Sequence, residues 1–359
     1  MRRWKVSFNA YLSRPERREF LRVTALSSAS LVTSSYCPLL EGASTPNIAG
    51  CRLMEFDVSY TTEISSLPRD AKVFSVWMPL PSTDHAQDIS NVQIESSLSY
   101  DVTQTEAFFS DTLHVHAKAS QAPCKIEARY HIARSRVGVH AEAVNMRDLA
   151  NYLQTTRTVR MTPDIEDFAT RIIGEASHPL EIGRRVFRGI QSLLTYDNTI
   201  PGCGTGDTAW IMKHHRGKCD DYHALFMAIM VSRGIPVRWE QGFPLPFPDE
   251  TTNTGGQIEG DCTGSHCWVS FYVPEYGWVP VDVSEADKTP FAGDFYFGNL
   301  TPNRFQVSTG RSVVLNPKQG GDPLPSFAFS YAEADGIPLV YLVNYQNIIS
   351  YSVTNVEFS

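Results

Sequence analysis

The apolar residues of this chain change their spacing twice, and this constrains the fold more than any other feature. Between residues 52 and 134 they alternate with polar residues, as in Met54–Tyr60 and Ile126–Ile132. From about 163 to 232 they recur every three or four residues, and beyond 266 they alternate again. Alternation predicts half-buried strands, whereas the longer spacing predicts amphipathic helices. We therefore expect an α+β protein that begins with a small β-sandwich.

Proline and glycine residues predict where the helices begin and end. Pro163 and Pro179 stand where a first helical turn tolerates proline, and a third helix over 219–232 should end at Gly234. Strands are expected over 266–273 and 278–283, which a turn at 274–277 joins into a hairpin. Further strand-like runs occupy 304–307, 312–315, 338–343 and 348–353.

The N-terminal residues differ in composition from the rest of the chain. Arg17 and Arg18 precede a short stretch rich in serine and alanine, which is similar to a twin-arginine export signal; the alternative is a disordered basic tail. We predict an exported protein, periplasmic or extracellular. Residues Ile48–Cys51 resemble a lipoprotein box, but they lie well past the apolar stretch, so a lipid anchor on Cys51 is the less favoured alternative.

The chain is 359 residues long, which favours more than one domain. We predict a signal and linker over 1–50, a β-sandwich over 51–135, a catalytic core over 136–300 and a C-terminal β extension over 301–359. The net charge is −8 and the basic excess is confined to the N-terminus, so a nucleic-acid partner is not expected. No run of about 18 apolar residues occurs, so no stable membrane span is expected.

One cysteine stands where a nucleophile is expected. Cys219 follows Arg216-Gly217-Lys218 and begins the third predicted helix. Free N–H groups at a helix start favour an anion and lower the pKa of a thiol there, and the thiolate is the nucleophilic form. The alternative is a small buried cysteine. Asp220 and Asp221 should cap or solvate the first turn.

A thiol nucleophile needs a base and a group that orients the base. His266 and Asp282 supply these types on the predicted hairpin. If Tyr272 faces Trp278 across the hairpin, His266 is a diagonal neighbour of Asp282 on the same face. The alternative is a structural histidine and a turn-capping aspartate.

The other six cysteines form no C-x-x-C pair, so the sequence supports neither a structural zinc site nor a thioredoxin-like site. The histidine pairs at 114/116 and 214/215 are interpreted as structural or solvated, and no metal or cofactor is predicted. Cys51 and Cys124 could form a disulfide, and Cys203 could pair with Cys262 or Cys267. On an alternating strand Cys267 should point away from His266, and therefore away from Cys219.

Several motifs together resemble the transglutaminase-like superfamily of Cys-His-Asp enzymes. These are the Gly217–Phe226 helix start, Arg233-Gly234-Ile235-Pro236-Val237-Arg238, His266-Cys267-Trp268 and Gly277-Trp278-Val279-Pro280-Val281-Asp282. The match covers about residues 160–285, and Trp77–Pro81 more loosely resembles the N-terminal domain of bacterial members. The resemblance implies a papain-like core, with helices packed on an antiparallel sheet.

By the same resemblance, Cys219 attacks an amide carbonyl, His266 carries the proton and Asp282 orients His266. The Cys219 N–H would help to hold the oxyanion, with Tyr196 and Trp210 as weak candidates for a second donor. We expect acyl transfer on a protein or peptide substrate, by hydrolysis rather than cross-linking. A true transglutaminase and a non-catalytic binding module on the same fold are the alternatives, and the oligomeric state is left open.

Overall fold

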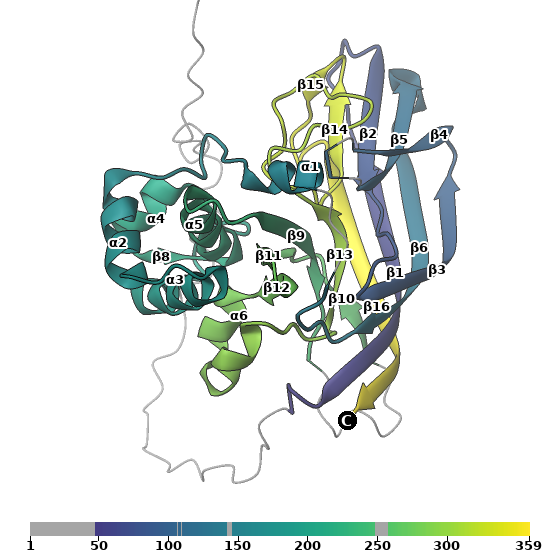
Figure 1. Ribbon diagram of the computed structural model, residues 1–359. Helices are drawn as coiled ribbons and strands as arrows, with labels where there is room; N and C mark the ends of the chain where they lie inside the picture. Colours follow the sequence, from purple (N-terminus) through teal and green to yellow (C-terminus); the bar gives the residue numbers. More distant parts are fainter. Residues whose placement is uncertain (1–46, 106, 109, 142–145, 248–257) are drawn as a thin grey trace, which may run out of the picture. The chain divides into compact units, whose positions relative to one another are not determined.

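Two five-stranded antiparallel sheets make up the β region of the protein (Figure 1). In the first sheet the strand order is β10 (Ile258–Asp261), β16 (Tyr345–Phe358), β1 (Cys51–Ile64), β6 (Cys124–Ser135), β3 (Gln87–Ser96). In the second it is β15 (Ile337–Pro338), β14 (Tyr331–Ala334), β2 (Val73–Pro79), β5 (Asp111–Lys118), β4 (Tyr100–Gln104). The computed structural model describes residues 47–105, 107–108, 110–141, 146–247 and 258–359. The predicted export signal lies outside them.

The core of this sandwich consists of the alternating residues that the sequence marks as apolar. Their side chains are buried in one cluster, drawn from strands of both sheets: Met54, Phe56, Val58, Tyr60, Phe74, Val76, Met78, Leu113, Val115, Ala117, Ile126, Ala128, Tyr130 and Ile132. Strand side chains alternate between the two faces of a sheet, so each strand contributes every second residue. The predicted β-sandwich and its inward face are confirmed.

The C-terminal strands complete both sheets of the sandwich. β16 pairs with β1 along its whole length, from Cys51 opposite Phe358 to Ile64 opposite Tyr345. β14 pairs with β2 in the other sheet. Residues 51–135 therefore share their sheets with residues from the end of the chain, a pairing that alternation within each strand cannot reveal.

A four-stranded antiparallel sheet carries the helical part of the protein. Its order is β12 (Gly277–Val281), β11 (His266–Val273), β9 (Val237–Pro244), β13 (Arg304–Thr309). The helices are α1 (Met146–Leu149), α2 (Pro163–Ile173), α3 (Pro179–Leu193), α4 (Thr208–His214), α5 (Cys219–Ser232) and α6 (Val283–Lys288), with 3₁₀ turns η3 (Ala119–Gln121), η4 (Ala150–Leu153) and η5 (Pro290–Tyr296). α5 is buried along almost its whole length, against α3 and β11.

The three predicted helices are confirmed as α2, α3 and α5. Pro163 is the first residue of α2, and Pro179 is the first residue of α3. Two strand predictions are wrong. Residues 312–315 form only an isolated bridge at Val313, and 338–343 contribute only Pro338 to β15. The second hairpin strand ends at Val281, because the Asp282 side chain caps α6.

The suggested disulfide between Cys51 and Cys124 is wrong. Cys51 begins β1, whereas Cys124 of β6 lies opposite Ile64 at the other end of β1. Thirteen strand residues separate the two positions, or about 40 Å at the usual rise, whereas a disulfide needs Cα atoms within about 7 Å. All six cysteines in the described part of the chain are free thiols. No helix there is long and apolar enough to cross a membrane.

Candidate active site

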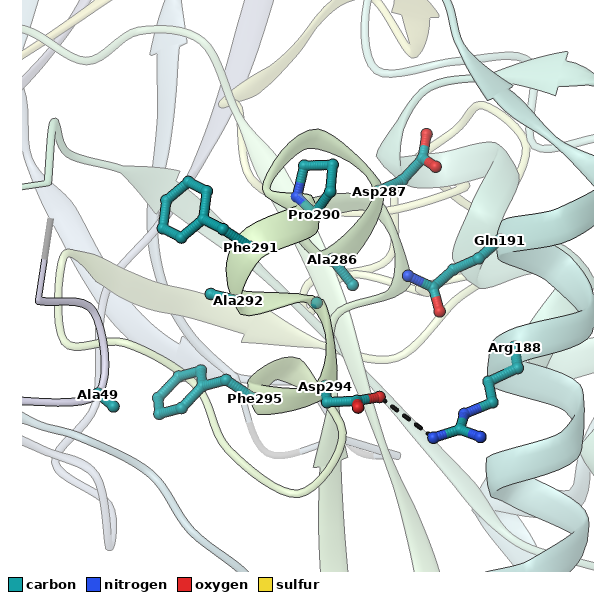
Figure 2. Close-up of a pocket in the computed structure, with 11 residues that line it drawn as sticks. Ala49, Arg188, Gln191, Ala286, Asp287, Pro290, Phe291, Ala292, Asp294 and Phe295 are labelled. Carbon is teal, nitrogen blue, oxygen red and sulfur yellow. Dashed lines mark hydrogen bonds and ion pairs between the residues drawn. The ribbon is translucent and has the colours of Figure 1, made fainter. Parts of the chain in front are cut away.

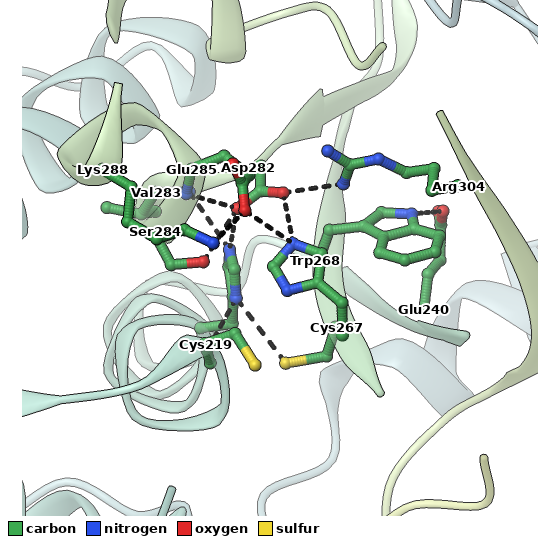
Figure 3. A network of polar contacts seen from close by, with 12 residues as sticks. Cys219, Glu240, Cys267, Trp268, Asp282, Val283, Ser284, Glu285, Lys288 and Arg304 are labelled. Carbon is green, nitrogen blue, oxygen red and sulfur yellow. Dashed lines mark hydrogen bonds and ion pairs between the residues drawn. The ribbon is translucent and has the colours of Figure 1, made fainter. Parts of the chain in front are cut away.

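The predicted histidine and aspartate lie in direct contact. β11 and β12 pair with Tyr272 opposite Trp278, the register that the sequence predicts. His266 Nε2 lies 2.7 Å from Asp282 Oδ2, and both side chains are buried (Figure 3). This hydrogen bond fixes the orientation of the imidazole and leaves Nδ1 as its second reactive nitrogen.

Asp282 takes part in four hydrogen bonds. Its Oδ1 accepts hydrogen bonds from the Glu285 amide at 2.9 Å and the Ser284 hydroxyl at 3.0 Å, so it caps α6 as it holds His266. Arg304 Nη1, from β13, donates to Oδ2 at 2.7 Å. Burial raises the pKa of this carboxyl, but the charges of His266 and Arg304 outweigh burial and hold it well below its usual value.

Arg304 is a site residue that the sequence reasoning missed. Its guanidinium is buried, lies 4.9 Å from the ring centroid of Trp268 and donates to Asp282. The available signal was an arginine at the start of a strand-like run, because a buried charge is retained only when it is paired. Its partner lies 22 residues away along the chain, and only the pairing of β13 with β9 brings the two together.

Cys219 is the first residue of α5, as predicted, and a rigid backbone holds it there. The preceding Arg216–Gly217 pair forms β8, which runs parallel to β7 (Thr195–Tyr196). Asp221 then closes the helix start: its carboxylate accepts from the amides of Lys218 at 2.9 Å and Thr205 at 2.8 Å. Asp220 pairs with Arg311. Both acids therefore act in capping and pairing.

His223 links the cysteine to the aspartate and was not predicted. Its Nδ1 lies 2.8 Å from the Cys219 carbonyl oxygen, and its Nε2 accepts the Val283 amide at 3.1 Å. These two contacts require the neutral tautomer with the proton on Nδ1. Burial lowers the pKa of His223 to about 4, which keeps it neutral. His223 thus connects the starts of α5 and α6. Its partner in α6, Val283, directly follows Asp282 in the chain.

The surroundings of Cys219 contradict two expectations. The sulfur of Cys267 faces that of Cys219 rather than turning away (Figure 3). α5 covers the face of β11 that carries Cys267, whereas His266 shares the other face with Trp268, at a ring-centroid distance of 5.9 Å. Alternation along β11 is therefore as predicted, but the inference about Cys219 is wrong.

The pKa of Cys219 is the second expectation that fails. A hydrogen bond from Cys203 lowers it, but the facing Cys267 thiol and burial raise it well above its ordinary value. Cys219 is only 3% exposed, so little water can solvate a thiolate. In the free protein the thiol form is therefore favoured, and a base has to remove its proton.

The two candidates for a second oxyanion donor differ in position. Tyr196 ends β7 and lies near the Cys219 thiol; burial raises the pKa of its hydroxyl, and Cys219 and Glu285 raise it further, so the hydroxyl keeps its proton. Trp210 belongs to α4, where its ring stacks on His214 with 4.3 Å between ring centroids. The structure therefore favours Tyr196 over Trp210.

Among the described residues, His266, Asp282 and Glu285 form a group whose ligand atoms lie within 4.8 Å of one another. Cations already pair with both carboxylates, because Arg304 bonds to Asp282 and Lys288 bonds to Glu285. A metal ion would have to displace one of these side chains, so the group is better suited to holding His266 than to holding a metal.

A pocket of about 570 Å³ lies beside α6 and η5 (Figure 2). Arg188 and Asp294 form an ion pair at 3.4 Å in its lining, and Phe291 and Phe295 contribute apolar surface. The lining includes none of Cys219, His266 and Asp282, and it contains no cysteine, serine or histidine. Among the described residues, its lining therefore offers no thiol, serine hydroxyl or imidazole.

Comparisons with known proteins show what this part of the chain is similar to. Residues 166–283 match the family model of the transglutaminase-like superfamily. An uncharacterized protein of Haemophilus influenzae is 25% identical over 346 residues, covering 85% of this chain and 93% of that protein. Bacillus subtilis YebA is 33% identical over 75 residues, which are 21% of this chain and 10% of that protein.

A solved structure extends the similarity to most of the fold. A Cytophaga hutchinsonii protein proposed to be a cysteine protease superposes with a TM-score of 0.53, covering 86% of this chain and 90% of that chain, at 12% identity. This identity supports the fold alone. Residues 166–283, which carry Cys219, His266 and Asp282, form a domain of the transglutaminase-like superfamily.

Proposed function

We propose that the protein is a thiol enzyme that transfers an acyl group from an amide bond, with Cys219 as nucleophile, His266 as base and Asp282 as the residue that orients His266. The observation that carries this proposal is the buried 2.7 Å bond between His266 Nε2 and Asp282 Oδ2, next to Val283, whose amide bonds to His223 at the start of α5. A group that orients a base beside a nucleophile is the shared feature of such triads.

In the first half-reaction the Cys219 sulfur attacks the amide carbonyl carbon. His266 takes the thiol proton on Nδ1, because Nε2 is bound to Asp282. General-base removal is needed because the pKa of the buried thiol is raised. The Asp282 carboxylate then faces an imidazolium, whose charge it stabilises.

The tetrahedral intermediate carries a negative oxygen that needs donors. The Cys219 amide stands at the first position of α5, where N–H groups have no acceptor within the helix. We assign the Tyr196 hydroxyl as the second donor. The C–N bond then breaks, and the leaving amine takes the proton from His266, which leaves a thioester on Cys219.

In the second half-reaction an acceptor attacks the thioester. Water gives a carboxylic acid, and an amine gives a new amide. We propose hydrolysis of a protein or peptide amide, because water is the abundant acceptor. A transglutaminase reaction stays the alternative within the same mechanism.

The test is mass spectrometry of the full protein incubated with a peptide library, with and without a primary amine. Hydrolysis should give cleaved or deamidated peptides whose yield does not change when the amine is added, and a thioester adduct on Cys219 in quenched samples. Cys219→Ala should abolish both products. Cys262→Ala, a buried cysteine of the sandwich cluster, is the matched control and should retain activity.

Two outcomes would change the proposal. If the main product is a peptide that carries the added amine, the protein is a transglutaminase. No adduct on Cys219 and no product from either wild type or Cys219→Ala would favour a binding module on this fold.

We also propose export, supported by the paired Arg17 and Arg18 in the sequence. Cys51 is fully buried at the start of β1, and Ile48 packs into the helical core, which argues against a lipid anchor there. Fractionation of cells that express the full chain should find the protein outside the cytoplasm. The Arg17→Lys, Arg18→Lys variant should stay in the cytoplasm. Equal distribution of the two would contradict export by this route.

A further inference from the structure

Cys219 lies among other thiols that the proposed reaction does not use. Cys267 of β11 belongs to the same buried cluster as Cys219 and is 1% exposed. Cys203 lies before α4, and its carbonyl oxygen is 3.7 Å from the Cys219 sulfur. A nucleophilic thiol beside a second thiol can form a disulfide with it, which an isolated thiol cannot do.

The Cys267 sulfur is oriented toward Cys219. Figure 3 shows the two sulfurs facing each other between α5 and β11. The same histidine contacts both residues: His223 Nδ1 lies 2.8 Å from the Cys219 carbonyl oxygen and 3.8 Å from the Cys267 sulfur. Because α5 and β11 already hold the two side chains against each other, a bond between the sulfurs needs little movement of the backbone.

The Cys203 thiol also interacts with the Cys219 thiol, but a further partner holds its sulfur. Its sulfur lies 2.7 Å from the Ser265 hydroxyl and 3.4 Å from the Ser265 carbonyl oxygen. The Cys267 sulfur has neither of these polar contacts, and its surroundings are the apolar side of α5. Cys267 is therefore the better placed of the two to react with Cys219.

We propose that Cys219 and Cys267 form a modification site, in which hydrogen peroxide converts the nucleophile reversibly to a disulfide and so switches the enzyme off. The inference rests on the proposed function, which makes Cys219 the reactive thiol. In the first step the Cys219 sulfur loses its proton and attacks one peroxide oxygen, the O–O bond breaks, and the departing hydroxide takes up the proton, so that sulfenic acid and water form. In the second, the Cys267 sulfur displaces the sulfenic oxygen, which leaves as water with the Cys267 proton.

The balance is one peroxide and two thiols to one disulfide and two waters. Without a second thiol, excess peroxide carries a sulfenic acid on to sulfinic acid, which thiol reductants do not reverse. The role of Cys267 is therefore to stop the oxidation of Cys219 at a recoverable stage.

The test uses the full chain, purified under reducing conditions and treated with hydrogen peroxide. Non-reducing peptide mapping should find a peptide that joins Cys219 to Cys267, and peptide hydrolysis should be lost. Dithiothreitol should restore the free thiols and most of the activity. Cys267→Ala should lose activity to peroxide irreversibly, with sulfinic acid on Cys219. Cys124→Ser, at a half-buried thiol of the sandwich, should respond as wild type does.

The results separate this inference from the proposed function. Peptide mapping reads the bridge without any substrate, so a bridge in a protein that hydrolyses nothing would contradict the proposed function alone. An active reduced enzyme that gives sulfinic acid on Cys219, or a bridge from Cys219 to Cys203, would overturn the assignment of Cys267. Should Cys267→Ala fail to fold, the mapping of the wild type still decides.

Discussion

The sandwich and the core of helices and sheet that carries Cys219 each bury a network of polar side chains, but the two networks differ in charge. In the sandwich, the Tyr60 hydroxyl donates to the Ala328 carbonyl at 2.9 Å and accepts from the Ser330 amide at 2.8 Å. In the core, Asp282 joins His266 and Arg304, both charged or chargeable. A neutral network needs only hydrogen-bond partners, whereas a buried charge also needs an opposite charge.

This difference separates the roles of the two regions. The Tyr60 network ties β1 to the segment before β14, and so joins strands that are far apart in sequence. The Asp282 network leaves one imidazole nitrogen uncommitted to the aspartate, on a ring whose centroid lies 6.5 Å from that of His223. We therefore expect changes in the core to alter the reaction first, and changes in the sandwich to alter stability alone.

Asp282→Asn should give the largest effect. The amide cannot stabilise an imidazolium, and we expect the rate of acyl-enzyme formation to fall by up to ~10⁴-fold. It also leaves buried Arg304 without its counter-charge, at a cost of about 3–5 kcal/mol in the free energy of unfolding. Single-turnover kinetics and urea titration measure the two effects.

Asp287→Asn is the matched control, because Asp287 lies in the same helix and accepts from the Tyr222 hydroxyl at 2.7 Å rather than from His266. Its rate should stay close to that of wild type. Equal loss of rate in both variants would remove the distinction between Asp282 and an ordinary hydrogen-bonded acid.

His223, a buried residue of the core, should make the free energy of unfolding depend on pH. Its pKa is about 4 in the folded protein and about 6.5 when unfolded, so its contribution is complete above pH 6.5. As pH falls from 6.5 to 4 the unfolded chain binds the proton first, and about 3 kcal/mol of stability should be lost. Urea titrations over this range measure the loss.

His223→Asn should flatten this part of the profile, whatever its stability at pH 7. His178→Asn, at a half-exposed histidine, is the control for replacing a histidine with asparagine. An identical slope in wild type and His223→Asn would show that His223 is not the neutral buried group described here.

Tyr60→Phe should give the smallest effect and should sharpen the comparison. It leaves the Ala328 carbonyl and the Ser330 amide unpaired in the sandwich, which should cost about 1–3 kcal/mol. The hydrolysis rate should not change, because Tyr60 lies in the sandwich cluster. Tyr276→Phe, at an exposed tyrosine, controls for loss of a hydroxyl. A slower reaction in Tyr60→Phe would show that the two networks are coupled.

Local patterns of residues were sufficient for much of this protein. The inward face of the sandwich followed from alternation, the starts of α2 and α3 from prolines, and the register of β11 against β12 from the length of one turn. The contact between His266 and Asp282 follows from that register, because a short hairpin leaves the chain little freedom. Their catalytic roles stay predictions.

What the tertiary structure decided involves partners that are distant along the chain. The pairing of β16 with β1, the Arg304–Asp282 ion pair and the contact between Cys267 and Cys219 join residues whose separation is unrelated to any local period. The sequence determined which face of each strand is apolar. Only the packing of α5 on β11 decided which face meets Cys219. The facing Cys267 thiol and burial there raise the pKa of the Cys219 thiol, although it stands at a helix start.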